Sequence, residues 1–132
     1  MIKLRTFQIH SPRKRGEGLR VGTVRFLPML VKKKDLAPLD YFDVWLPTLA
    51  PSRKLMQRAK HLLELGKWDD KHWAKFMQHY RHEMETQRDS QQAIELIAQI
   101  AKRTPISVGC YCDDEDWCHR SILRALIEKA AK

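Results

Sequence analysis

One stretch near the C-terminus indicates how the chain folds: Thr104-Pro105-Ile106-Ser107-Val108-Gly109-Cys110-Tyr111-Cys112-Asp113-Asp114-Glu115-Asp116-Trp117-Cys118-His119-Arg120. Apolar residues at 106, 108 and 110 alternate with small ones at 107 and 109, which predicts a short strand that begins after Pro105. An acidic loop follows. From Trp117 onward the apolar residues recur along one helical face. The stretch therefore predicts a strand, an acidic loop and a helix, with Cys118 and His119 in the first turn of the helix.

The rest of the chain repeats these two kinds of apolar pattern. Segments in which apolar residues alternate with other residues predict strands near 2–9, 20–26, 41–46 and 105–111. Segments in which apolar residues recur every three or four positions predict helices near 52–65, 69–87, 90–103 and 117–130. Ser52 is suited to cap the first helix, and Asp69 or Asp70 the second. We therefore expect a single α/β domain over residues 1–132, an α/β sandwich with a partly parallel sheet of about four strands flanked by helices. The strand at 105–111 should lie inside this sheet.

The composition excludes some classes of protein. No apolar run approaches the roughly 20 residues that span a bilayer, and the N-terminus has no signal-peptide pattern. Three cysteines, an odd number without an export signal, favour a reducing, cytoplasmic location. We therefore expect a cytoplasmic protein with no membrane partner.

The net charge of +9 is concentrated in the first quarter of the chain. Residues 1–34 hold ten lysines and arginines against Glu17 alone, and the remainder is balanced. Such a basic segment could bind nucleic acid or another polyanion. The alternative is that these residues occupy solvated loops and serve solubility.

The Cys118-His119-Arg120 motif could carry chemistry. Unpaired backbone N–H groups and the helix dipole favour a thiolate at a helix N-terminus, so Cys118 is predicted to be the most reactive of the three thiols. Consecutive helical residues point about 100° apart, so direct contact between Cys118 and His119 is not expected. Arg120 lies near the N-terminus of its helix, where the helix dipole is unfavourable for a positive charge. It should pair with the acidic run 113–116 or with an external anion.

The three cysteines could instead bind a metal ion. Thiolate and imidazole ligands suit zinc or iron, and Cys110 and Cys112 would lie on one face of the sheet if the strand persisted. Two other interpretations stay open. Cys110 and Cys112 could pack as small apolar groups, or Cys112 and Cys118 could form a disulfide across the acidic loop.

Several pieces of the sequence resemble the YeaO-like family of small bacterial proteins, known chiefly as a domain of unknown function. They are Gly18-Leu19-Arg20-Val21 with Arg25, the segment from Asp43 to Ser52, Trp68 with Phe76, Tyr80-Arg81-His82-Glu83, and Cys118-His119-Arg120. Where many relatives have Asp before Arg in the second strand, this chain has Thr23-Val24-Arg25. The resemblance implies a compact α/β sandwich in which the Cys-His-Arg helix faces Arg25 and the Tyr80–Glu83 helix. It implies no established reaction.

These observations lead to one functional hypothesis and one alternative. We expect a polar pocket at the start of the last helix, for a small anionic ligand, a metal ion (zinc or iron) or thiol chemistry, with the reaction class unassigned. Its catalytic residues would be Cys118, His119 and Arg120, its ligand-binding residues Arg25, Tyr80 and Glu83, and its metal ligands Cys110 and Cys112. The alternative is a nucleic-acid-binding module that uses the basic N-terminal segment.

Overall fold

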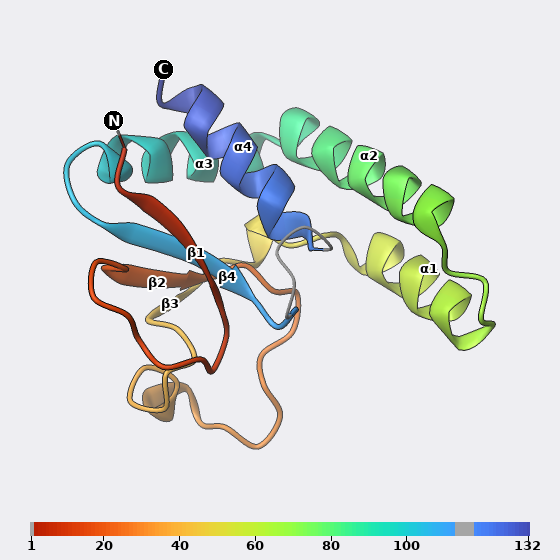
Figure 1. The fold of residues 1–132 in the computed structure, drawn as a ribbon, viewed down its shortest axis with the longest axis horizontal. Helices are drawn as coiled ribbons and strands as arrows, with labels where there is room; N and C mark the ends of the chain where they lie inside the picture. The colour runs from red at the N-terminus through yellow and green to blue at the C-terminus, as the bar shows by residue number, and fades with distance from the viewer. Residues whose placement is uncertain (1, 113–117) are drawn as a thin grey trace.

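The strands of the computed structural model, which describes residues 2–112 and 118–132, form one sheet in the order β1-β4-β2-β3 (Figure 1). Every pairing is parallel, with Leu4 opposite Ile106 in one ladder and Val21 opposite Val108 in the next. The central position of β4 confirms that the 105–111 segment lies inside the sheet. The four strands described are β1 (Leu4–Gln8), β2 (Leu19–Gly22), β3 (Val44–Trp45) and β4 (Ile106–Cys110).

Four α-helices in the described ranges follow the predicted order. They are α1 (Arg53–Glu64), α2 (Asp70–Thr86), α3 (Arg88–Ala101) and α4 (His119–Ala130). The Ser52 hydroxyl accepts a hydrogen bond from the Leu55 amide, which confirms Ser52 as the N-cap of α1. The Asp69 carboxylate accepts one from the His72 amide, so of the two predicted candidates Asp69 is the N-cap of α2. Short 3-10 turns lie between β2 and β3 at Lys33–Asp35 and between β3 and α1 at Pro47–Leu49.

The helices cover one face of the sheet. Helices α3 and α4 pack on the strands, α2 packs on α3 and α4, and α1 contacts α2 beyond the edge of the sheet (Figure 1). The larger core cluster lies at this helix–sheet interface, where Leu4, Ile106 and Val108 meet Leu123 and Ile127. The α/β class is therefore confirmed, as a helical layer on a fully parallel sheet.

Irregular chain covers the opposite face. Phe7, Val24, Leu36 and Phe42 form a second core cluster there, and Cys110 and Cys118 join this cluster where β4 ends and α4 begins. Two glycines make this face possible because aromatic rings lie directly on them. A Cβ at Gly109 would come within 2.6 Å of the Phe7 ring, and one at Gly22 would come within 2.4 Å of the Phe42 ring.

The carboxyl ends of the strands define one edge of the sheet. Gln8, Gly22 and Cys110 lie there because the ladders run in register, and α4 begins at the same edge. Ligands of open parallel sheets bind at this edge. None of the helices in the described ranges is long and apolar enough to span a membrane.

Candidate functional site

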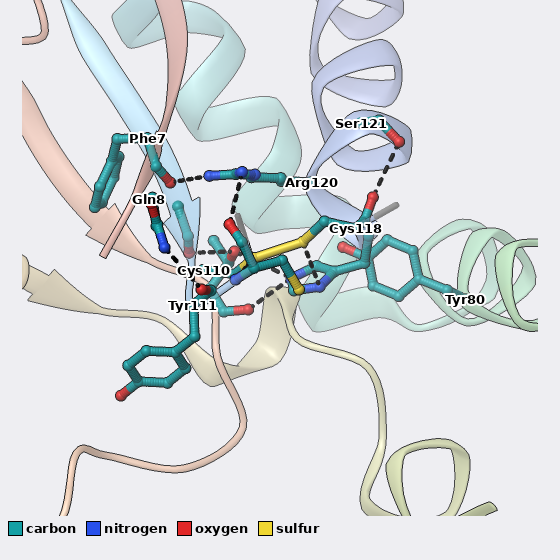
Figure 2. The surroundings of a disulfide bond; sticks show 12 residues. Phe7, Gln8, Tyr80, Cys110, Tyr111, Cys118, Arg120 and Ser121 are labelled. Atoms are coloured by element: carbon teal, nitrogen blue, oxygen red, sulfur yellow. Dashed lines mark hydrogen bonds between the residues drawn. A yellow bond between two sulfur atoms is a disulfide. The ribbon is translucent and has the colours of Figure 1, made fainter. Parts of the chain in front are cut away.

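Three sulfur atoms converge where β4 ends and α4 begins. The Sγ atoms of Cys110, Cys112 and Cys118 all lie within 4.8 Å of one another. Cys110 and Cys118 are buried and joined as a disulfide (Figure 2). Cys112 is exposed. The disulfide considered between Cys112 and Cys118 is therefore not the observed one. Strand β4 ends at Cys110, so Cys112 lies in the loop and brings its sulfur to the cluster from outside the sheet.

Backbone hydrogen bonds support the sulfur cluster. The Cys112 amide donates to Cys110 Sγ at 3.4 Å, an arrangement that would stabilise a thiolate at Cys110 when the disulfide is reduced. Cys118 was predicted in the first turn of the helix, but it is the N-cap of α4, with extended backbone (φ −141°, ψ 149°), and the helix begins one residue later at His119. Its carbonyl oxygen accepts hydrogen bonds from the amide and the hydroxyl of Ser121. The sulfur therefore lies beside the positive end of the helix dipole.

The extended backbone at Cys118 also brings it into contact with His119. Cys118 Sγ lies 3.7 Å from His119 Nδ1, although two consecutive helical residues would diverge. The expectation of no direct contact is thus wrong, because Cys118 has not yet entered the helix. On the other side of the ring, His119 Nε2 lies 2.8 Å from the Thr23 carbonyl oxygen and donates to it.

The His119 ring is held in one protonation state. Burial lowers the pKa of His119 to about 4, and the positive charge of Arg120 acts in the same direction, against the hydrogen bond to Thr23. The ring packs edge-on against Tyr80 with centroids 5.1 Å apart. At neutral pH the imidazole is therefore neutral, with its Nε2–H on Thr23 and the Nδ1 lone pair directed toward the Cys118 sulfur.

Arg120 positions the loop that carries Cys112. Its Nη1 donates to the Phe7 carbonyl oxygen and its Nη2 to the Cys112 carbonyl oxygen at 2.9 Å, so the side chain joins β1 to the start of the acidic loop (Figure 2). Its Nε is buried and has no hydrogen-bond partner among residues 2–112 and 118–132. The acidic run 113–116, predicted as a partner of Arg120, lies outside the described residues.

A pocket of about 330 Å³ opens beside the sulfur cluster. Its walls come from the 24–26 segment, Pro51, helix α1 and the start of α2, and the three cysteines and His119 form one side. The lining is mostly apolar, with aromatic rings from Phe26, Trp68, Trp73, Phe76 and Tyr111. The sequence predicted a polar pocket. The structure corrects this, because Tyr80, Glu83 and Arg120 bind backbone groups instead of lining the pocket. Arg25, Cys118 and His119 do line it.

Arg25, Tyr80 and Glu83 all bind one turn of the backbone. Tyr80 donates to the Leu49 carbonyl oxygen at 2.7 Å, and Arg25 donates to the carbonyl oxygens of Ala50 and Pro51 at 3.2 and 3.0 Å. The Glu83 carboxylate accepts from the Ser52 amide at 3.0 Å. These three residues therefore fix the 49–52 segment, which carries Pro51 into the pocket wall. Of the three, Arg25 also lines the pocket itself.

A comparison against family models identifies the family of this chain. The model of DUF488-N3a, described as the active DUF488-N3 subclade, matches residues 4–131. The chain belongs to this DUF488-N3a family. DUF488 includes the YeaO-like proteins that the sequence resembles. Comparisons with curated proteins and with solved structures give no significant match.

In this DUF488-N3a chain, the predicted site residues divide into two groups. Cys110, Cys112, Cys118 and His119 come together at the pocket, whereas Arg120 and Glu83 serve the surrounding backbone. Cys118 was expected to be the most reactive thiol. It is 1% exposed, so a reagent in solution meets Cys112 first.

Sequence reasoning missed the aromatic wall of the pocket. Trp73 and Phe76 belong to the apolar repeat of α2, yet both are half-exposed and stack on each other with centroids 5.6 Å apart. A signal was present in α1, where Met56 and Leu63 remain exposed on the pocket side. When the apolar face of a helix extends beyond the residues that pack in the core, the exposed apolar residues are typical of a binding surface.

Part of the basic N-terminal segment is neutralised inside the fold. Arg20 is fully buried, pairs with Glu17 at 2.9 Å and lies over the Phe7 ring at 4.4 Å. Arg13 pairs with Asp43 at 2.7 Å. Nucleic-acid binding by the remaining basic residues stays a prediction.

Proposed function

We propose that this DUF488-N3a protein uses Cys110, Cys112 and Cys118 to hold a metal ion, zinc in the first place, at the edge of an apolar ligand pocket. The observation that carries the proposal is the convergence of three sulfur atoms within 4.8 Å. A tetrahedral zinc site with Zn–S bonds of about 2.3 Å places its sulfurs roughly 3.8 Å apart. Small side-chain adjustments around the observed positions would give such a site.

The backbone spacing of the two buried cysteines supports a shared ion. Their Cα atoms are 7.9 Å apart, whereas disulfides usually join Cα atoms about 4.4–6.8 Å apart. Two thiolates on opposite sides of an ion can span the wider distance. A disulfide and a bound ion are thus alternative states of the same sulfurs, and a reducing cytoplasm would favour the ion.

The surrounding charges suit a thiolate site. Three thiolates and one divalent cation carry a net negative charge, which the N-terminus of α4 and the buried guanidinium of Arg120 would offset. Three protein ligands leave a fourth position, as in catalytic zinc sites. Here that position would be taken by His119 Nδ1 or by a molecule in the pocket. The family's description as an active subclade is consistent with a working site.

The test is metal analysis of protein purified under reducing conditions. We expect about one zinc ion per chain after reconstitution, and Co²⁺ substitution should give the intense visible bands and the sulfur charge-transfer absorption of a tetrahedral thiolate site. Cys112→Ser should lose most of the affinity, because it removes an exposed ligand without disturbing the core. His82→Gln, an exposed histidine remote from the cysteines in sequence, serves as the matched control and should bind normally.

Two results would overturn the proposal. One is a reduced wild-type protein that takes up neither Zn²⁺ nor Co²⁺. The other is a Cys112→Ser variant whose metal content and spectrum match those of the wild type, since the ion would then be held elsewhere.

A further inference from the structure

The aromatic walls of the pocket point to a flat ligand. Trp73 and Phe76 stack with an interplanar angle of 12°, and Trp68 meets both rings edge-on, with centroids 6.4 and 6.1 Å away. On the opposing segment Phe26 is 53% exposed. A volume of about 330 Å³ lies at the lower end of the range for small-molecule sites. Aromatic rings lining such a space favour an aromatic guest through stacked and edge-on contacts.

Arg25 gives the pocket one fixed positive charge. Its guanidinium is half-buried and its described hydrogen bonds use Nε and Nη2 on two carbonyl oxygens, which fix the side chain in place. No carboxylate in residues 2–112 and 118–132 pairs with it. A guanidinium beside apolar walls is weakly hydrated and binds planar acid groups well.

We propose that this pocket binds a small aromatic anion, with its ring among Trp68, Trp73 and Phe26 and its acid group on Arg25. The inference rests on the proposed function in that the ligand would lie beside the metal-binding cysteines. A nucleotide also combines a ring with an anion. The apolar lining offers few hydrogen-bonding groups for the edge of a base, so an aromatic carboxylate suits the walls better.

The test uses 1-naphthoate and the full chain, reduced and freed of metal with a chelator. Because Trp68 and Trp73 line the pocket, binding can be followed by tryptophan fluorescence, at about pH 6.5 where ordinary thiols are protonated. We expect saturable binding of 1-naphthoate. The uncharged 1-naphthalenemethanol and the non-aromatic cyclohexanecarboxylate should each bind about tenfold more weakly or worse.

Two variants and one control locate the binding site. Arg25→Gln should weaken 1-naphthoate binding by about tenfold or more and weaken 1-naphthalenemethanol binding much less. Because Arg25 also holds the 50–51 backbone, Ala59→Phe provides an independent variant that fills the pocket from α1 and should abolish binding. Arg58→Gln removes an exposed arginine of the same helix and should bind 1-naphthoate as the wild type does.

Three outcomes would overturn the inference. They are equal affinity for the charged and uncharged naphthalenes, binding of AMP without binding of 1-naphthoate, and no binding of any probe. The metal proposal is judged separately. Because the assay is metal-free, 1-naphthoate binding by a protein that takes up no metal upholds this inference alone. Metal uptake without 1-naphthoate binding overturns this inference alone.

Discussion

The hydrogen bond from Tyr80 to the 49–52 turn allows a quantitative test of how the pocket is built. Tyr80 and Leu49 are both fully buried, and the hydroxyl donates to the carbonyl oxygen at 2.7 Å. Burial, and secondarily the charge of Glu83, raises the pKa of Tyr80 well above its usual value, so the hydroxyl remains a donor throughout the neutral range. Tyr80→Phe removes this donor and leaves the shape of the ring unchanged.

The expected loss of stability follows from the Leu49 carbonyl oxygen, which has lost the Tyr80 hydroxyl as its donor. Loss of a hydrogen bond that leaves a buried partner unsatisfied costs about 1–3 kcal/mol. We therefore expect Tyr80→Phe to lower the free energy of unfolding by about 2 kcal/mol, and Tm by roughly 6–10 °C for a domain of this size. Because the same turn places Pro51 in the pocket wall, affinity for 1-naphthoate should also fall.

Urea denaturation followed by circular dichroism measures the change. Tyr111→Phe is the matched control, because Tyr111 is 44% exposed and its hydroxyl should contribute little to stability. If Tyr80→Phe were no more destabilising than Tyr111→Phe, the bond from Tyr80 to Leu49 would not be what holds the turn.

Three further predictions concern the surrounding fold. Glu17→Gln leaves the fully buried Arg20 without its counter-charge and should cost about 3–5 kcal/mol in urea denaturation, so a loss near zero would contradict the buried ion pair. Gly109→Ala forces a methyl group against the Phe7 ring and should lower the free energy of unfolding by about 1–3 kcal/mol. Adding Phe7→Leu to the same chain should recover part of this loss. No recovery would mean that the ring is not the obstacle. Because burial lowers the pKa of His119 from 6.5 to about 4, the folded state binds fewer protons than the unfolded chain between these values, so stability is fully present above pH 6.5 and declines as the pH falls toward 4. Between pH 7 and pH 5 the free energy of unfolding of the metal-free, reduced protein should fall by about 2 kcal/mol because of His119. An equal fall in wild type and His119→Gln would refute this prediction.

The candidate site could be predicted from the sequence only in part. The cysteines and His119 stand close together in the chain, so any fold that turns between β4 and α4 brings them near one another. Arg25 and Tyr80 were also singled out, but as residues that line the pocket with polar groups. Their polar ends bind the backbone of a turn that lies 25 to 31 residues away in the sequence, a distance over which no local pattern specifies a partner.

The sequence by itself determined the secondary structure and the class of fold, because apolar period and capping residues act over a few neighbours. Ser52, Asp69 and the alternation through Cys110 are local signals, and the structure follows each of them. Only the tertiary structure decided that Cys110 rather than Cys112 lies against Cys118, and that the pocket beside them is apolar. The physical reason is that these features depend on where β4 ends and on how α1 and α2 pack beyond the edge of the sheet. Both are set by contacts between segments far apart in the chain.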